Sequence, residues 1–120
     1  MIKDILAIAL IATLAGCAAP ASYTTASMVD YDKDTTYAVV DTPDGFDLTV
    51  NYGRYQFIPE SPAVATACKA ALTSIAWDVA KRRGREIDPV NEQRIRISMG
   101  RNGFSGITTC SANVPAAWKK

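Results

Sequence analysis

The feature that most constrains the fold of this chain is a stripe of apolar residues that is long enough for a helix. Shorter segments with the residue pattern of strands lie before and after it in the sequence. The stripe consists of apolar residues at the spacing of one helical face, Val64, Cys68, Leu72, Ile75 and Val79. Ser61 and Pro62 suit the start of such a helix as cap and first helical residue, and Gly84 suits its end, after basic residues at 81–83. The sequence therefore predicts a single long helix whose apolar face must pack against strands.

Two strand patterns precede this helix. Residues 37–40 favour a strand, and the Thr-Pro-Asp-Gly sequence at 42–45 favours a turn. Apolar residues then alternate with polar ones, as in the second strand of a hairpin with one buried face, at Phe46, Leu48, Val50 and Tyr52.

The alternation breaks at Gly53, and two interpretations follow. A β-bulge at Gly53 would turn Tyr55 and Phe57 back towards the core. Without a bulge, these two side chains would face solvent as an aromatic patch. An isolated glycine inside a strand pattern favours the bulge.

A second pair of strands follows the helix. Residues 94–99 alternate, with Ile95, Ile97 and Met99 on one face and Arg94, Arg96 and Ser98 on the other. Residues 100–103 favour a turn, and residues 104–114 supply a further strand. The predicted order is β-β-α-β-β, which is an α+β fold with two layers, one helix packed on a small antiparallel sheet.

An apolar run of eleven residues, 5–15, lies near the start of the chain. A membrane-spanning helix needs about 20 apolar residues, whereas the core of a signal peptide needs about 7 to 15. The run ends at Leu14-Ala15-Gly16-Cys17, which resembles the lipobox of bacterial prolipoproteins over the first 17 residues. A simple secretory signal with an incidental cysteine, or an uncleaved anchor, is the alternative.

The lipobox resemblance implies a membrane-attached product. It implies that the leader, residues 1–16, is removed, that Cys17 carries a diacylglyceryl thioether, and that its new amino group is acylated. Ala18 follows the cysteine where the family uses Asp for retention at the inner membrane, which favours the outer membrane in a host that has two. Two or more acyl chains make such an attachment effectively permanent.

The sequence predicts three segments. Residues 1–16 are the lipoprotein signal peptide, and residues 17–35, rich in Ala, Ser, Thr and Asp, are the lipidated N-terminus and a flexible tether. Residues 36–120 are the α+β domain. Removal of 16 residues from 120 leaves 104, which is enough for one hydrophobic core.

The chain has three cysteines and no histidine. With Cys17 acylated, Cys68 and Cys110 remain as an even pair in an oxidising compartment, which favours a disulfide that closes the domain. Two buried free thiols are the alternative. No Cys-x-x-Cys pattern occurs, so we expect no metal site and no cofactor.

Charge is unevenly distributed. Residues 17–60 hold seven acids and two bases (−5), and residues 61–120 hold ten bases and four acids (+6). Pairing between the halves is the ordinary explanation, and two faces for different partners is the alternative. The near-neutral total, with 13 basic and 12 acidic residues, argues against a nucleic-acid partner.

The search for catalytic patterns gives no candidate. The absence of histidine excludes Ser-His-Asp and Cys-His catalysis. Residues 103–107 resemble a nucleophile elbow but end in Ile107, where that motif requires glycine. We therefore expect a non-enzymatic protein.

Two non-enzymatic functions are the main hypotheses, and an enzyme that uses two close carboxylates in a cleft is a third, although no specific pair stands out. The first is an outer-membrane-anchored periplasmic lipoprotein that acts as an envelope adaptor or binding module for an envelope protein. Its expected docking surface is an open polar sheet face that includes Asp47, Arg94 and Arg96, with the arginines able to pair with Asp47. The alternative is a small inhibitor or ligand-binding lipoprotein that uses exposed Tyr55 and Phe57. Exposure of these two aromatics separates the hypotheses.

Overall fold

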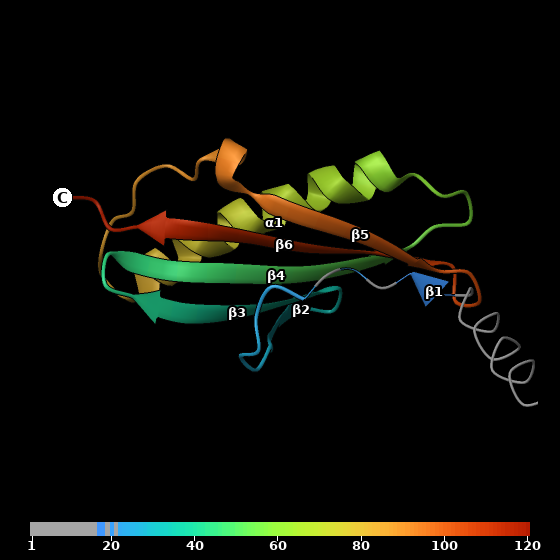
Figure 1. The fold of residues 1–120 in the computed structure, drawn as a ribbon, viewed down its shortest axis with the longest axis horizontal. Helices are drawn as coiled ribbons and strands as arrows, with labels where there is room; N and C mark the ends of the chain where they lie inside the picture. The colour runs from blue at the N-terminus through green and yellow to red at the C-terminus, as the bar shows by residue number, and fades with distance from the viewer. Residues whose placement is uncertain (1–16, 19, 21) are drawn as a thin grey trace, which may run out of the picture.

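A computed structural model describes residues 17, 18, 20 and 22–120; the predicted signal peptide, 1–16, lies outside the described residues. The described chain forms a six-stranded antiparallel sheet with one helix packed over one face (Figure 1). This arrangement confirms the predicted two-layer α+β fold.

The strands are arranged in the order β1-β5-β6-β4-β3-β2. Their bounds in chain order are Cys17–Ala18 (β1), Val29–Asp32 (β2), Thr35–Thr42 (β3), Gly45–Tyr55 (β4), Arg96–Asn102 (β5) and Ile107–Ala117 (β6). The helix α1 spans Ser61–Arg82, and a short 3-10 turn, η2, spans Glu92–Arg94. The central strands β4 and β6 pair over their full length, from Gly45↔Ala117 to Tyr55↔Ile107.

The core lies between α1 and the central strands. All five residues of the predicted helical stripe are buried, and Phe46, Leu48 and Val50 of β4 face them. Gly84 follows the helix with φ +65°, as expected for its end. The helix begins one residue earlier than predicted, because Glu60 and not Ser61 is the N-cap. The backbone N–H of Glu60 donates to Oε1 of Gln56 at 2.9 Å.

A disulfide joins Cys68 of α1 to Cys110 of β6. Both residues are fully buried within the core, and their Cα atoms are 6.3 Å apart. The predicted pairing is confirmed, so the helix is covalently attached to the centre of the sheet.

The predicted bulge at Gly53 is wrong. The pairing of β4 with β6 continues without a shift through Gly53↔Thr109 to the end of both strands. Tyr52 is half-buried and Arg54, two residues further on the same face, is exposed. The alternation therefore breaks because the helix-covered core ends at Tyr52, and not because the strand bends.

The predicted tether, 17–35, needs correction. Residues 29–32 form β2, which pairs with β3, and Thr35 is a buried member of β3. A hollow lies between the segment that joins β1 to β2 and the sheet face opposite α1. It is lined by Pro20, Ser22, Tyr23, Thr24, Ala26 and Met28 on one side and by Thr49, Asn51 and Ser111 on the other. Most residues of the segment are small or polar, which made it resemble a solvated linker in the sequence.

The second hairpin is displaced from its predicted bounds. Arg94 lies in η2 rather than in a strand, β5 begins at Arg96, and the turn falls at 103–106. The two strands are thereby each shifted towards the C-terminus by two to three residues.

Removal of the disulfide should strongly destabilise this domain. The double substitution Cys68→Ala/Cys110→Ala opens a loop with a sequence separation of 42 residues, and we expect it to lower the free energy of unfolding by about 4 kcal/mol. Urea denaturation measures the change. Reduction of the unsubstituted protein should give a similar loss, and an unchanged midpoint after reduction would contradict the expectation.

Candidate functional site

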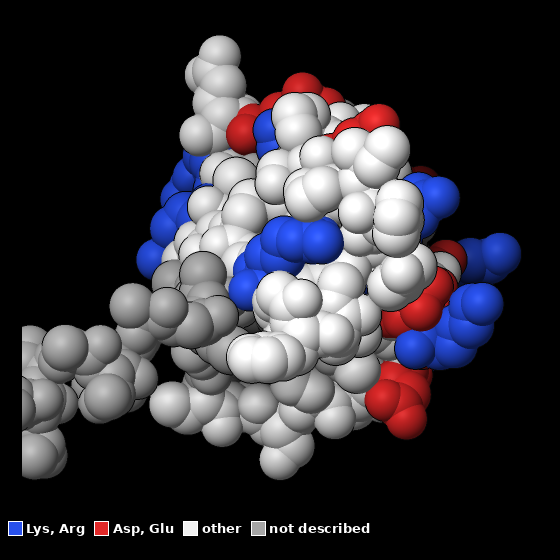
Figure 2. Space-filling view, turned by 90° about the vertical axis from the view of Figure 1, so that its right-hand side faces the viewer, with Lys and Arg blue, Asp and Glu red and all other residues white. Residues whose placement is uncertain are grey.

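Five large apolar side chains are exposed at one end of the sheet. They are Tyr55 (63%), Phe57 (85%), Ile58 (71%), Phe104 (95%) and Ile107 (38%). They come from the end of β4, the β4–α1 loop and the β5–β6 turn. We call these five residues the apolar platform. Figure 2 views this end of the molecule, where uncharged atoms cover most of the described surface.

Hydrogen bonds join the two loops that carry the apolar platform. The backbone N–H of Gln56 donates to the Gly106 carbonyl at 2.9 Å. The Arg101 guanidinium donates to the Gln56 carbonyl at 3.2 Å, to the Gly106 carbonyl at 3.4 Å and to Thr108 Oγ1 at 2.9 Å. Arg101 thus fastens the β4–α1 loop to the β5–β6 turn, and the loops behave as one unit.

The β5–β6 turn is also braced internally. Asn102 Oδ1 accepts from the backbone N–H groups of Phe104 at 2.9 Å and Ser105 at 3.3 Å. Gly106 has φ +72°, and a Cβ added there would lie 2.7 Å from Cε2 of Tyr55. The turn therefore favours glycine for its backbone angle, and a side chain at 106 would also displace the exposed Tyr55 ring.

Cys17, the cysteine of the predicted lipobox, enters the sheet at the same end. In the register of the strands, Cys17 pairs with Asn102, Asn102 with Ile107, and Ile107 with Tyr55. These four residues form the terminal row of the sheet. Strands lie about 4.8 Å apart, so the Cys17 backbone is about 10 Å from that of Ile107 and about 14 Å from that of Tyr55.

The polar sheet face is not the open surface that the sequence suggested. Asn113, which is 1% exposed, lies at its centre and donates from Nδ2 to Asp47 Oδ2 and Thr49 Oγ1, both at 2.9 Å. Arg96 donates to Asn113 Oδ1 at 2.6 and 3.2 Å. Asp47 and Arg96 are therefore connected through Asn113, and neither Arg94 nor Arg96 forms an ion pair with Asp47 among the described residues.

The N-terminal segment covers part of this face. The Tyr23 ring lies under the Arg96 guanidinium, with 4.9 Å between the guanidinium carbon and the ring centroid. Sequence reasoning missed both Tyr23 and Asn113. An asparagine between Ala112 and Val114 in a strand that is buried on both faces was the available signal for a buried polar network.

Seven basic residues lie between residues 81 and 101, and most of them contact different parts of the protein. They are Lys81, Arg82, Arg83, Arg85, Arg94, Arg96 and Arg101. Near the end of α1, Arg83 forms an ion pair with Asp41, and the Arg85 guanidinium lies 4.4 Å from the Trp118 ring centroid. The Arg83–Asp41 pair joins the basic half of the chain to the acidic half, which is the ordinary explanation of the charge asymmetry.

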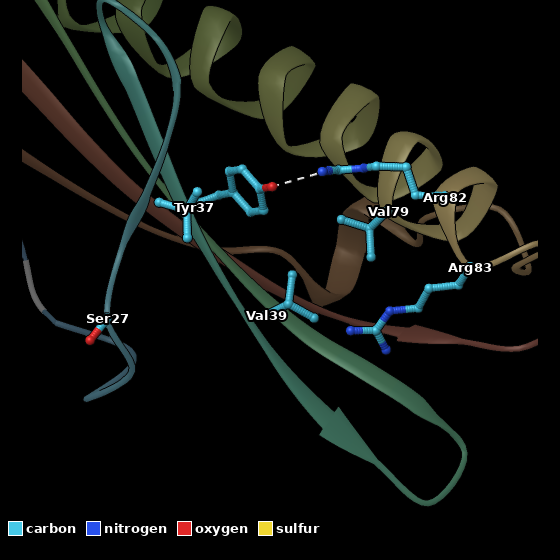
Figure 3. A pocket seen from close by; sticks show the side chains of 7 residues that line it. Ser27, Tyr37, Val39, Val79, Arg82 and Arg83 are labelled. Carbon is cyan, nitrogen blue, oxygen red and sulfur yellow. Dashed lines mark hydrogen bonds between the residues drawn. The ribbon is translucent and has the colours of Figure 1, made fainter.

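A shallow pocket of about 320 Å³ lies between the start of β3 and the end of α1. In Figure 3 the Arg82 side chain points along this pocket to Tyr37, to whose hydroxyl it donates at 3.1 Å. Arg83, which directly follows α1, extends towards Val39 in this view. Both arginines already contact protein groups, Tyr37 for Arg82 and Asp41 for Arg83.

A tyrosine near this pocket has a perturbed pKa. The Tyr31 hydroxyl donates to Asp78 Oδ2 at 2.8 Å. This hydrogen bond to a carboxylate raises the pKa of Tyr31 above its usual 10.0, with smaller contributions from desolvation and from the Asp78 charge. The same hydrogen bond joins β2 to α1.

Two further features were sought in the part of the chain that the structure describes. No group of three or more side chains from Cys, Asp and Glu is placed there to hold a metal ion. No helix within it has both the length and the apolar character needed to cross a bilayer.

Comparison of the chain with protein-family models, curated proteins and solved structures gives no match. Of the predicted site residues, Tyr55 and Phe57 lie with three further apolar residues at the end of the sheet that contains Cys17. Asp47 and Arg96 are linked through the buried amide of Asn113. Arg94 lies apart from them, in η2.

The Asn113 network should contribute substantially to stability. Asn113→Ala leaves Arg96, Asp47 and buried Thr49 without their shared partner, and we expect a loss of about 1–3 kcal/mol in the free energy of unfolding. Asn51→Ala is the matched control, because Asn51 projects from the same sheet face but is exposed. Chemical denaturation compares the two variants, and equal losses would argue against a structural role for the network.

Proposed function

We propose that this chain is an outer-membrane-anchored periplasmic lipoprotein, held by lipid on Cys17, whose domain is a non-enzymatic binding module for an envelope component. The observation that carries the proposal is the terminal row of the sheet, in which the lipobox cysteine stands beside the exposed apolar platform.

Cysteine use supports the anchor and its compartment. The Cys68–Cys110 disulfide is of the kind that forms outside the reducing cytosol. Cys17 is the one cysteine left over, and it is the residue at which the lipobox resemblance requires acylation.

Exposure of side chains supports the apolar platform as the binding surface. Monomeric proteins rarely expose large contiguous apolar patches unless these meet a partner or a membrane. The polar sheet face is the weaker candidate, since Thr49, Ser111 and Asn113 on it are at most 2% exposed, and the side chains of Thr49 and Asn113 already hydrogen-bond to each other.

A small inhibitor or ligand-binding lipoprotein is the second candidate. One observation favours it: Tyr55 and Phe57 are 63% and 85% exposed, as a module that binds through these aromatics requires. Exposure is the observation expected to separate the two candidates, and it favours this one; the first candidate stands only with the apolar platform, instead of the polar sheet face, as its docking surface.

The lipid anchor can be tested directly in a bacterium with two membranes. We expect mass spectrometry of the tryptic peptide 17–33 to find a diacylglyceryl group on Cys17 and an acylated amino terminus. Cys17→Ala should abolish both modifications and leave the leader attached.

Ala18→Asp is the matched control for the anchor. By analogy with the family, this variant keeps its lipid but fractionates with the inner membrane instead of the outer. A natural protein with an unmodified Cys17, or one cleaved at another site, would overturn the proposed function.

A further inference from the structure

We infer that the partner of the apolar platform is the lipid bilayer that holds the acyl chains of Cys17, so that the domain stands with this end of the sheet on the membrane surface. The inference rests on the proposed acylation. It names a lipid surface, rather than a protein, as the occupant of the platform.

No spacer separates the proposed anchor, Cys17, from the sheet among the described residues. Cys17 is itself paired in the sheet, opposite Asn102, and the antiparallel register makes Cys17 the outermost residue of β1 at this end. The residues expected to form a tether instead run back along the sheet towards β2 (Figure 1). Acyl chains on Cys17 would therefore bring the terminal row of the sheet to the bilayer.

The second argument is the chemistry of the apolar platform. It combines two phenylalanines and a tyrosine with two isoleucines, and aromatic rings are the side chains that favour the boundary between acyl chains and headgroups. Phe104 and Phe57, the two most exposed, lie on separate loops, so that each can enter the boundary.

The third argument is charge. Arg54 is exposed in β4 next to Tyr55, and long basic side chains pair with lipid phosphates while their stems lie on apolar surface. Figure 2 shows basic atoms in the middle of this end, surrounded by uncharged ones, while the acidic atoms visible there lie towards the rim.

The fourth argument is the fixed geometry of the loops. The bonds from Arg101 and Gln56 hold the two loops together, and the Asn102 side chain holds the backbone of Phe104. The apolar side chains are thus presented in place before binding, and docking requires little further ordering of the loops.

The test uses tryptophan as a depth probe in the full acylated protein. Phe104→Trp and Ile58→Trp place the probe on each loop of the apolar platform. Val40→Trp is the matched control, because Val40 is also exposed (43%) but lies near the opposite end of the sheet, where β3 pairs with Asp47. The emission of Trp77 and Trp118 in the unsubstituted protein is subtracted.

Each protein is reconstituted in vesicles of phosphatidylethanolamine and phosphatidylglycerol, with and without bromine on the acyl chains. We expect the tryptophans at 58 and 104 to emit at shorter wavelength in vesicles than in buffer without vesicles or detergent. Brominated lipid should quench most of their fluorescence. The probe at 40 should keep its emission.

Mass spectrometry of peptide 17–33 from the same samples separates the two ideas. Unquenched probes at 58 and 104 in a chain acylated at Cys17 would overturn the membrane contact alone. Equal quenching at 40 would also overturn it, because the domain would then lie flat. A chain that carries no lipid would overturn the proposed function, and this inference with it.

Discussion

The unbroken pairing of β4 with β6 is the constraint on which the rest of the structure depends. Side chains on a strand alternate between the two faces of the sheet, so the register of one strand pair decides which side chains lie on each face. On one face this ladder sets Leu48, Val114 and Cys110 against α1, where the disulfide closes. On the other it sets Thr49 directly opposite Asn113. Its last rung, Tyr55↔Ile107, begins the apolar platform.

The sequence predicted the parts of the fold that depend on regular apolar spacing. The helix stripe, the alternation of Phe46 to Tyr52 and the pairing of Cys68 with Cys110 were all legible, because each is buried against one continuous core. The prediction failed at Gly53, where the apolar alternation ended although the strand did not. A pattern reports the extent of the buried core, and a strand can run beyond it.

The candidate site was predicted only in part. Tyr55 and Phe57 were singled out, but Ile58, Phe104 and Ile107 join them through contacts between loops that no local spacing encodes. The covered sheet face was missed for a different reason. Its cover is made of small and polar residues over Thr49 and Asn113, and such residues are also typical of a solvated linker. When polar groups are buried against other polar groups, the hydrophobic pattern of the sequence does not reveal their burial.

The fastening of two loops by Arg101 has a consequence for how this end of the molecule can vary. Tyr55, Arg101 and Gly106 share one small volume: the ring lies on the glycine, and the guanidinium bonds to its carbonyl. A larger residue at 106 displaces the ring, and a shorter one at 101 leaves the Gln56–Gly106 backbone bond to hold the loops together without the guanidinium. Effects of changes at such contacting positions do not add. At the end of the sheet beside Cys17, a change at one of these positions therefore alters the cost of a change at the others.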